Sequence, residues 1–163
     1  MKILIVSDTH GHFKKLYKVV LEHDNADYII HLGDCDVDIK EIATLFPSKQ
    51  IKNVCGNCDR FSDTNAMQEF TIDGVSFFIT HGDAYGVKQD TTLFWNATKQ
   101  RGATIGLFGH THKAIHYHKD GVHIFNPGSL ALPRGQKYPT YGILELNRTI
   151  PTFTIHELKE MLP

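Results

Sequence analysis

The chain has no long hydrophobic run, few cysteines and no excess of charge of either sign. No segment approaches the roughly 18 apolar residues of a membrane-spanning helix. The N-terminal apolar run is too short for a signal peptide because Ser7 and Asp8 interrupt it. We therefore expect a soluble, unexported protein with no membrane partner. Three cysteines, Cys35, Cys55 and Cys58, are an odd number that favours reduced thiols in the cytoplasm.

The charge balance argues against a polyanionic partner. Lys and Arg total 17 and Asp and Glu total 18, a formal net charge of −1, so no overall positive field would hold nucleic acid. The 163 residues, 41% of them hydrophobic, indicate one globular domain spanning residues 1–163. Histidine is unusually common, with 11 residues. Because neutral imidazole is the commonest metal ligand, the histidine positions guide the functional interpretation.

Short apolar runs and helical periodicity alternate in the first part of the chain, which predicts a parallel sheet covered by helices. The predicted strands are Ile3–Val6, Tyr28–Ile30, Ile51–Val54, Val75–Thr80 and Ile105–Phe108. The predicted helices are His12–His23, Val37–Phe46 and Asp90–Arg101.

The second part of the chain carries hairpin signals. An Asp-Gly pair lies between alternating apolar residues in 70–78 and again in 116–124, and this pair favours two-residue hairpin turns. Two further strands are predicted at Tyr141–Leu146 and Thr152–His156. The pattern predicts an α/β (α+β) fold with a mixed sheet, or two packed mixed sheets, flanked by helices.

Polar side chains follow each of the five strands at the point where it ends. They are Asp8, His10, Asp34, Asn57, His81, His110 and His112. Because ligand sites lie beyond the carboxyl ends of strands, we expect one shared pocket. Seven ligands are too many for one ion, and mixed nitrogen and oxygen donors suit Mn, Fe, Co, Ni or Zn better than Ca²⁺ or Mg²⁺. Two ions sharing a carboxylate fit this set, and two-metal sites catalyse displacement at phosphorus.

Formal charge favours a diester as the substrate. Two divalent ions, the two carboxylates and a bridging hydroxide leave a single positive charge. A phosphodiester neutralises that charge, whereas a phosphomonoester dianion exceeds it.

Each motif also has a simpler structural interpretation. Asp8-Thr9-His10 alone fits a helix N-cap, and Gly33-Asp34 alone is ordinary turn chemistry. The coincidence of five such motifs, each at the end of an apolar run, favours a metal site. Cys55-x-x-Cys58 could instead form a redox pair or part of a zinc site, but either interpretation leaves the other four motifs without a role.

The five motifs together resemble those of a known enzyme family. Asp8-x-His10, Gly33-Asp34, Gly56-Asn57-x-Asp59, His81-Gly82 and Gly109-His110-x-His112 are similar, in this order, to the motif series of the calcineurin-like metallophosphoesterases. Residues 126–129 (Asn-Pro-Gly-Ser), followed by Pro133-Arg134, resemble its small bacterial and archaeal phosphodiesterase branch, the YfcE-like group. The resemblance implies a β-sandwich flanked by helices, a di-metal centre, for which we expect Mn²⁺, and a homo-oligomer such as a dimer.

The resemblance also implies roles for individual residues. Asp8, His10, Asp34 and His112 would hold one metal ion, and Asp34, Asn57, His81 and His110 the other, with Asp34 as the bridge. Asn57 and His110 would also serve catalysis, and Asp59 would orient its own loop. Asn57, Ser129 or Arg134 could contact substrate. Cys58 stands where many family members have the histidine thought to protonate the leaving group. A thiol is a poorer acid near neutral pH, so we expect a preference for good leaving groups unless Cys58 itself, Arg60 or a bound water takes over this role.

These observations predict a metal-dependent phosphodiesterase in which a metal-bridging hydroxide hydrolyses a small-molecule diester. The alternative is a non-catalytic protein-binding scaffold of the same fold, as in the retromer subunit of this superfamily. Such a scaffold can lose metal ligands, whereas this chain retains all seven. A nuclease would need a basic groove or an extra domain, and neither is visible in the sequence.

Overall fold

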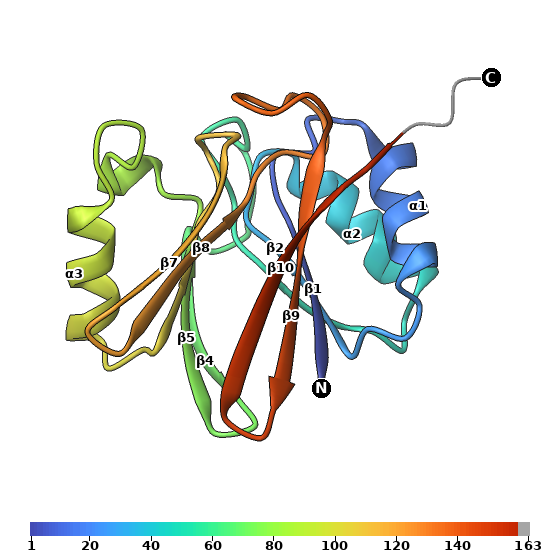
Figure 1. Ribbon diagram of the computed structural model, residues 1–163. Coiled ribbons are helices and arrows are strands. Elements are labelled where there is room, and N and C mark those ends of the chain that lie inside the picture. Colours follow the sequence, from blue (N-terminus) through green and yellow to red (C-terminus); the bar gives the residue numbers. More distant parts are fainter. Residues whose placement is uncertain (160–163) are drawn as a thin grey trace.

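The computed structural model describes residues 1–159, and residues 160–163 of the expected domain lie outside the described residues. The strands form two five-stranded mixed sheets that pack face to face, with helices on the outer faces (Figure 1). This arrangement confirms the predicted α/β (α+β) fold with two packed sheets. Within residues 1–159 no helix has the length and apolar character needed to span a bilayer.

The first sheet has the order β10-β9-β1-β2-β3. Its strands are β1 (Lys2–Val6), β2 (Tyr28–His31), β3 (Gln50–Asn53), β9 (Thr140–Asn147) and β10 (Ile150–Glu157). β1, β2 and β3 are parallel, and β9 and β10 are antiparallel to their neighbours. Parallel neighbours need long crossover connections, which here contain α1 (Phe13–Glu22) and α2 (Asp36–Leu45).

The second sheet has the order β4-β5-β6-β8-β7. Its strands are β4 (Met67–Ile72), β5 (Val75–Thr80), β6 (Ile105–Leu107), β7 (Ala114–Lys119) and β8 (Val122–Pro127). The short helix η1 (Asp83–Tyr85) and α3 (Thr92–Gln100) connect β5 to β6. Both predicted hairpins form, because Asp73 and Asp120 adopt the left-handed backbone conformation that the turn requires (φ 48° and 49°).

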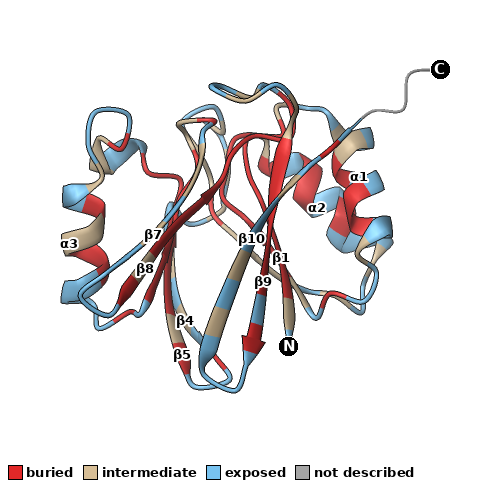
Figure 2. Ribbon diagram, in the orientation of Figure 1, coloured by how far each residue is buried: buried red, intermediate tan, exposed pale blue. Residues whose placement is uncertain are grey.

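Successive apolar side chains of the buried strands point to opposite faces of their sheet, so each face packs against another layer. Ile3 and Ile5 of β1 face the second sheet, while Leu4 and Val6 face α1 and α2. Phe94 of α3 packs on the outer face of the second sheet. Figure 2 shows the consequence: the inner strands are buried and the outward faces of the helices are exposed.

The fold directs several strand ends to one place. β1, β2 and β3 run parallel in the first sheet, and β5, β6 and β8 run parallel in the second. Hydrogen bonds join the loops that follow the strands of the two sheets: His110 N–H donates to Asp8 Oδ2 (3.1 Å), and His81 Nδ1 lies 2.7 Å from Leu32 O. The carboxyl ends of the parallel strands of both sheets therefore lie at one shared edge of the molecule.

Candidate metal centre

The seven polar residues predicted from the sequence meet at this shared edge. The first sheet contributes Asp8, His10, Asp34 and Asn57, and the second contributes His81, His110 and His112. Ligand atoms of Asp8, His10, Asp34 and His112 all lie within 4.8 Å of one another. Residues separated by about 100 positions in the chain are thus close enough to share an ion.

The first group of side chains surrounds a buried carboxylate oxygen. Asp8 Oδ1 is buried and, among residues 1–159, has no hydrogen-bond partner, although His112 Nε2 lies 3.1 Å away. His10 Nε2 lies 3.3 Å from His112 Nε2. Asp8 Oδ2 is already engaged, since it accepts hydrogen bonds from Ser7 Oγ (2.6 Å) and His110 N–H (3.1 Å). Only Oδ1 of this carboxylate is left to bind a ligand.

The second group surrounds the Nε2 atom of His81. This nitrogen lies 3.2 Å from Asn57 Oδ1, 3.2 Å from His110 Nδ1 and 3.5 Å from Asp34 Oδ2. Asn57 and His110 lie in loops that follow strands of different sheets, β3 and β6. The group therefore forms only when the two sheets pack together.

Asp34 lies between the two groups. Its Oδ2 atom is 3.7 Å from His10 Nε2 on one side and 3.5 Å from His81 Nε2 on the other. Its Oδ1 atom accepts a hydrogen bond from Cys58 N–H at 2.9 Å, which fixes the carboxylate plane. A single carboxylate oxygen is thus within reach of both groups.

Backbone carbonyls orient two of the imidazoles. His81 Nδ1 lies 2.7 Å from Leu32 O, and His112 Nδ1 lies 2.7 Å from Leu132 O. A carbonyl only accepts hydrogen bonds, so each Nδ1 carries the proton and each Nε2 presents a lone pair to the centre. This arrangement is the usual way in which proteins set the tautomer of a metal-binding histidine.

The loops of the centre have an uncommon backbone conformation. Left-handed φ angles occur at Asp8 (54°), His10 (45°), Asp34 (59°), His110 (66°) and His112 (59°). Such angles are rare outside glycine and are frequent at functional sites. Gly56 makes close packing possible, because a Cβ atom there would overlap the Asp34 carboxylate. A Cβ atom at Gly109 would overlap Ser7 Oγ.

The charges of the centre shift several pKa values. Burial would raise the pKa of Asp34, but contacts with His81 and Cys58 N–H outweigh burial and hold this pKa well below its usual range. Burial would lower the pKa of His81, but the nearby Asp34 and Asp8 carboxylates raise it. The contact with Asp8 raises the pKa of His112, whereas burial and the neighbouring His81 lower the pKa of His110.

These residues fit divalent cations of the borderline class. Asp8 and Asp34 are almost completely buried, and within residues 1–159 their ion-pair partners are imidazoles rather than lysine or arginine. Buried carboxylates need a compensating positive charge. The oxygen of Asp8 without a hydrogen bond and the imidazole nitrogens that face one another are donor atoms suited to such ions.

Asp59 organises the backbone of the centre. Its carboxylate accepts hydrogen bonds from the N–H groups of Asp34 (3.0 Å), Cys35 (2.8 Å), Asp36 (3.0 Å) and Gly56 (2.7 Å). The sequence predicted that Asp59 orients its own loop. Its contacts extend further, because it joins that loop to the Asp34 loop and to the first turn of α2.

The predicted substrate contacts differ in their surroundings. Ser129 is fully buried, and its hydroxyl donates to Asp8 O (2.8 Å) and accepts from Leu132 N–H (2.9 Å). It supports the Asp8 loop from behind, so its hydroxyl is not available to substrate. Arg134 is exposed and lines a cavity with Lys88 and Lys113. Asn57 is exposed, as a substrate contact would be.

Cys58 is exposed beside the centre and lies next to negative charge. Burial of part of its surface and the Asp34 carboxylate raise the pKa of the thiol to about 11. Cys55 and Cys58 are both free thiols. The alternative that these cysteines are the functional group leaves the surrounding carboxylates and imidazoles unexplained.

Two contributions to this region were not predicted from the sequence. Asn126 Nδ2 donates to Gly109 O at 2.7 Å and thereby holds the loop that carries His110 and His112. Phe61 lies fully exposed next to the centre, in a cleft with His10. An aromatic residue two positions after the Gly-Asn-x-Asp motif is a signal that could have indicated it.

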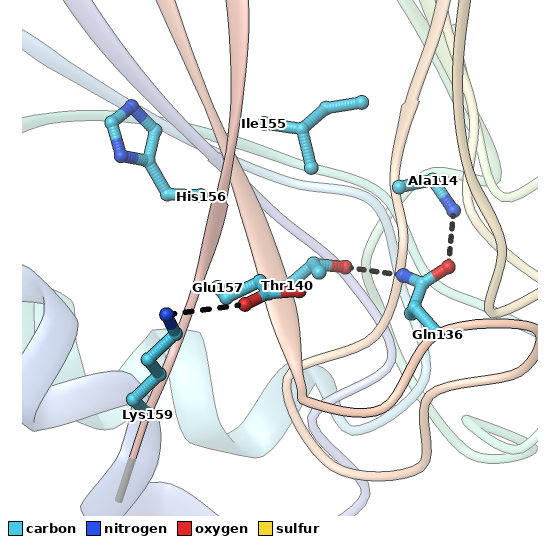
Figure 3. Close-up of a pocket in the computed structure, with 7 residues that line it drawn as sticks. All are labelled: Ala114, Gln136, Thr140, Ile155, His156, Glu157 and Lys159. Atoms are coloured by element: carbon cyan, nitrogen blue, oxygen red, sulfur yellow. Dashed lines mark hydrogen bonds and ion pairs between the residues drawn. The ribbon is translucent and has the colours of Figure 1, made fainter.

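A cavity of about 620 Å³ lies away from the centre, between the start of β7 and the end of β10. Figure 3 shows that Gln136 spans this cavity wall, bonded to the backbone of Ala114 (3.3 Å) and to Thr140 Oγ1 (2.7 Å). Glu157, which pairs with Thr140 across β9 and β10, forms an ion pair with Lys159 at the same cavity. None of the seven candidate ligands lines this cavity, so it is separate from the metal centre.

Comparison with known proteins identifies the class. The model of the calcineurin-like phosphoesterase superfamily domain matches residues 1–149, so the chain belongs to this metal-dependent superfamily. The chain is 32% identical to the probable metallophosphoesterase YsnB of Bacillus subtilis over 158 residues, covering 96% of this chain and 91% of the relative. It is 25% identical to the phosphodiesterase YfcE of Escherichia coli, covering 89% and 88%.

A solved structure supports the fold. A mutant Vps29 from Entamoeba histolytica aligns with a TM-score of 0.80 at 21% identity, over 98% of this chain and 94% of that chain. This likeness concerns the fold alone. The family model and the relatives together confirm the predicted resemblance to the calcineurin-like metallophosphoesterases, and YfcE is among the proteins to which the chain is similar.

Proposed function

We propose that this chain hydrolyses small-molecule phosphodiesters at a centre of two divalent metal ions, with Mn²⁺ as the favoured ion and Fe, Co, Ni or Zn as alternatives. One ion would be held by Asp8, His10, Asp34 and His112. The other would be held by Asp34, Asn57, His81 and His110. The observation that carries the proposal is the position of Asp34 Oδ2, which lies within 3.7 Å of donor nitrogens in both groups.

The residues of the chain would prepare the site for reaction. Two bound divalent ions lower the pKa of water and offset the negative charge on a phosphate group. His81 and His112 are held rigidly by carbonyls, so their donor nitrogens need no rearrangement. The exposed amide of Asn57 can donate a hydrogen bond to a phosphate oxygen while its carbonyl oxygen faces His81.

We further propose that diesters are preferred over monoesters, because two divalent ions, two carboxylates and one hydroxide would leave a single positive charge for the substrate to neutralise. The proposed setting is a single-domain cytoplasmic protein that forms homodimers. Nucleic acid is not proposed as a partner, since the net charge of −1 supplies no general attraction for it.

Removal of the metal tests the proposed activity. Protein dialysed against a chelator should lose hydrolysis of bis(4-nitrophenyl) phosphate, and added Mn²⁺ should restore it. Metal content measured by mass spectrometry should rise towards two ions per chain as activity returns. Restored metal without turnover would instead support the scaffold alternative, to which the fold likeness to Vps29 draws attention.

Substitution of Cys58 by histidine tests leaving-group protonation. A thiol whose pKa is raised to about 11 gives up its proton less readily than an imidazolium near neutral pH. We expect Cys58→His to increase kcat/KM for alkyl diesters, which have poor leaving groups, by roughly tenfold or more. Hydrolysis of 4-nitrophenyl diesters should change little, because this leaving group departs without protonation.

Cys58→Ser is the matched control for that substitution, since it keeps the size of the side chain without adding an imidazole. An equal gain for both kinds of leaving group, or no gain for alkyl diesters, would contradict a protonation role for position 58.

A further inference from the structure

A cleft of about 490 Å³ opens directly beside the candidate metal centre. His10 and Cys58 line it on the side of the centre. Its other walls include Val37 and Lys40 from α2, and Arg60 and Phe61 from the loop after β3. The volume lies within the range of roughly 300–1,000 Å³ that is typical of small-molecule sites. A substrate whose phosphate reaches the centre would therefore extend into this cleft.

The apolar side chains of the cleft are unusually exposed. Phe61 is fully exposed and Val37 is 65% exposed, although both are large enough to gain from burial. They lie in one cleft, on the loop and on α2. An exposed aromatic face next to a reactive centre is suited to stacking with a planar ring, which would remove both apolar surfaces from water.

The cleft contains two cationic side chains, Lys40 and Arg60, and they differ in their partners. Lys40 pairs with Asp36 at 3.0 Å and with Asp63 at 2.6 Å. The carboxylate of Asp59 is taken up by four backbone N–H groups. Arg60, by contrast, has no hydrogen bond or ion pair from its side chain to any residue within 1–159. Its planar guanidinium can therefore bind a second phosphate group in a two-pronged manner.

We propose that this cleft binds a nucleotide arm of the substrate, with the base against Phe61 and Val37 and an additional phosphate beside Arg60. The substrates are accordingly nucleotide-containing phosphodiesters, including those joined through a diphosphate linkage. This inference rests on the proposed function, because it places the reacting phosphorus at the candidate centre. The combination of a ring-binding surface and a free cation favours a nucleotide over a purely apolar alcohol.

The reaction is a hydrolysis that needs only water as co-reactant. The oxygen of water forms a new bond to phosphorus, and the bond from phosphorus to the leaving oxygen breaks. The electron pair of that bond stays with the leaving group. The protons of water pass to the products or to solvent. The products are a monophosphate and either an alcohol or a second monophosphate.

Three ligands separate the contributions of base and phosphate. Binding of ribose 5-phosphate, AMP and ADP to the Mn²⁺-loaded protein is measured by titration calorimetry. The base should make AMP bind roughly tenfold more tightly than ribose 5-phosphate, as stacking on an aromatic side chain does elsewhere. Phe61→Ala should reduce this ratio to about one and leave the affinity for ribose 5-phosphate unchanged.

Arg60→Gln tests the charge separately. It should reduce the preference for ADP over AMP several-fold while the preference for AMP over ribose 5-phosphate stays. Leu93→Ala is the matched control, since Leu93 is an exposed apolar residue on α3, which packs on the second sheet. This variant should change none of the three affinities.

The two hypotheses fail in different ways. Equal affinities of the parent protein for AMP and ribose 5-phosphate, or a ratio unaffected by Phe61→Ala, overturn the nucleotide cleft even if diesters are hydrolysed. Hydrolysis of the 4-nitrophenyl ester of thymidine 5′-phosphate is measured in parallel with that of methyl 4-nitrophenyl phosphate. If base-dependent binding is found but neither ester is hydrolysed, the proposed function fails and the nucleotide cleft stands.

Discussion

Replacing Asp34 with asparagine should release both ions of the proposed centre and lower the proposed phosphodiester hydrolysis by at least about 10³-fold. Loss of a group that merely supports a metal ligand typically reduces metal affinity or activity about 10–100-fold, and Asp34 is within reach of both donor groups. The amide of asparagine carries no negative charge. The two proposed cations, held beside His10 and His81, would then repel each other with one fewer carboxylate to offset their charge. The effect should therefore exceed that of removing any residue confined to one group.

Metal content after dialysis is the primary measurement for Asp34→Asn, with kcat/KM for bis(4-nitrophenyl) phosphate alongside. Asp38→Asn is a suitable control, because Asp38 is also buried but bonds to the backbone of Gly11 instead of facing the donor groups. The control should retain two ions per chain. If Asp34→Asn also retained two ions, the shared role of this carboxylate would be wrong.

Replacing Asp59 with alanine should cost about 3 kcal/mol or more of unfolding free energy. The substitution leaves four backbone donors around the Asp34 loop without their acceptor, and a buried donor left unsatisfied costs about 1–3 kcal/mol. Part of that cost is recovered where water reaches the loop, so the individual values do not add in full. The variant should also bind metal more weakly, because Asp34 loses its support.

Urea unfolding of the metal-free protein measures the effect of Asp59→Ala without interference from bound ions. Asp63→Ala serves as the control, because Asp63 is an exposed acidic residue in the same loop. The control should shift the unfolding midpoint far less than Asp59→Ala, because it removes only an exposed ion pair with Lys40. Equal midpoints for the two variants would show that the backbone contacts of Asp59 do not stabilise the fold.

The secondary structure could be predicted from the sequence because local patterns agree with the fold. The predicted helix His12–His23 is observed as Phe13–Glu22, and Asp-Gly marks both hairpin turns. The ends of elements follow less closely from local patterns: the predicted helix Asp90–Arg101 is observed as Thr92–Gln100. The order of strands within each sheet depends on long-range pairing, which local patterns do not encode.

The candidate ligands could be predicted because each follows an apolar strand in the chain. The orientation of the side chains around these ligands could not be predicted from the sequence. Whether a hydroxyl such as that of Ser129 faces the solvent or the back of a loop depends on residues more than 100 positions away, here Asp8. The position of Phe61 after the Gly-Asn-x-Asp motif indicates that it lies near the centre, but its exposure does not follow from the sequence, because aromatic residues are commonly buried.

The division of the donor groups between the two sheets has a consequence for motion. Asp8 and Asp34 extend from one sheet, and His81 and His112 from the other. Ions bound by ligands from both sheets would cross-link the two sheets at this edge and oppose their separation. Amide hydrogen exchange in β1 and β6 should then slow together when Mn²⁺ is added, so the cofactor would tighten the scaffold that holds it.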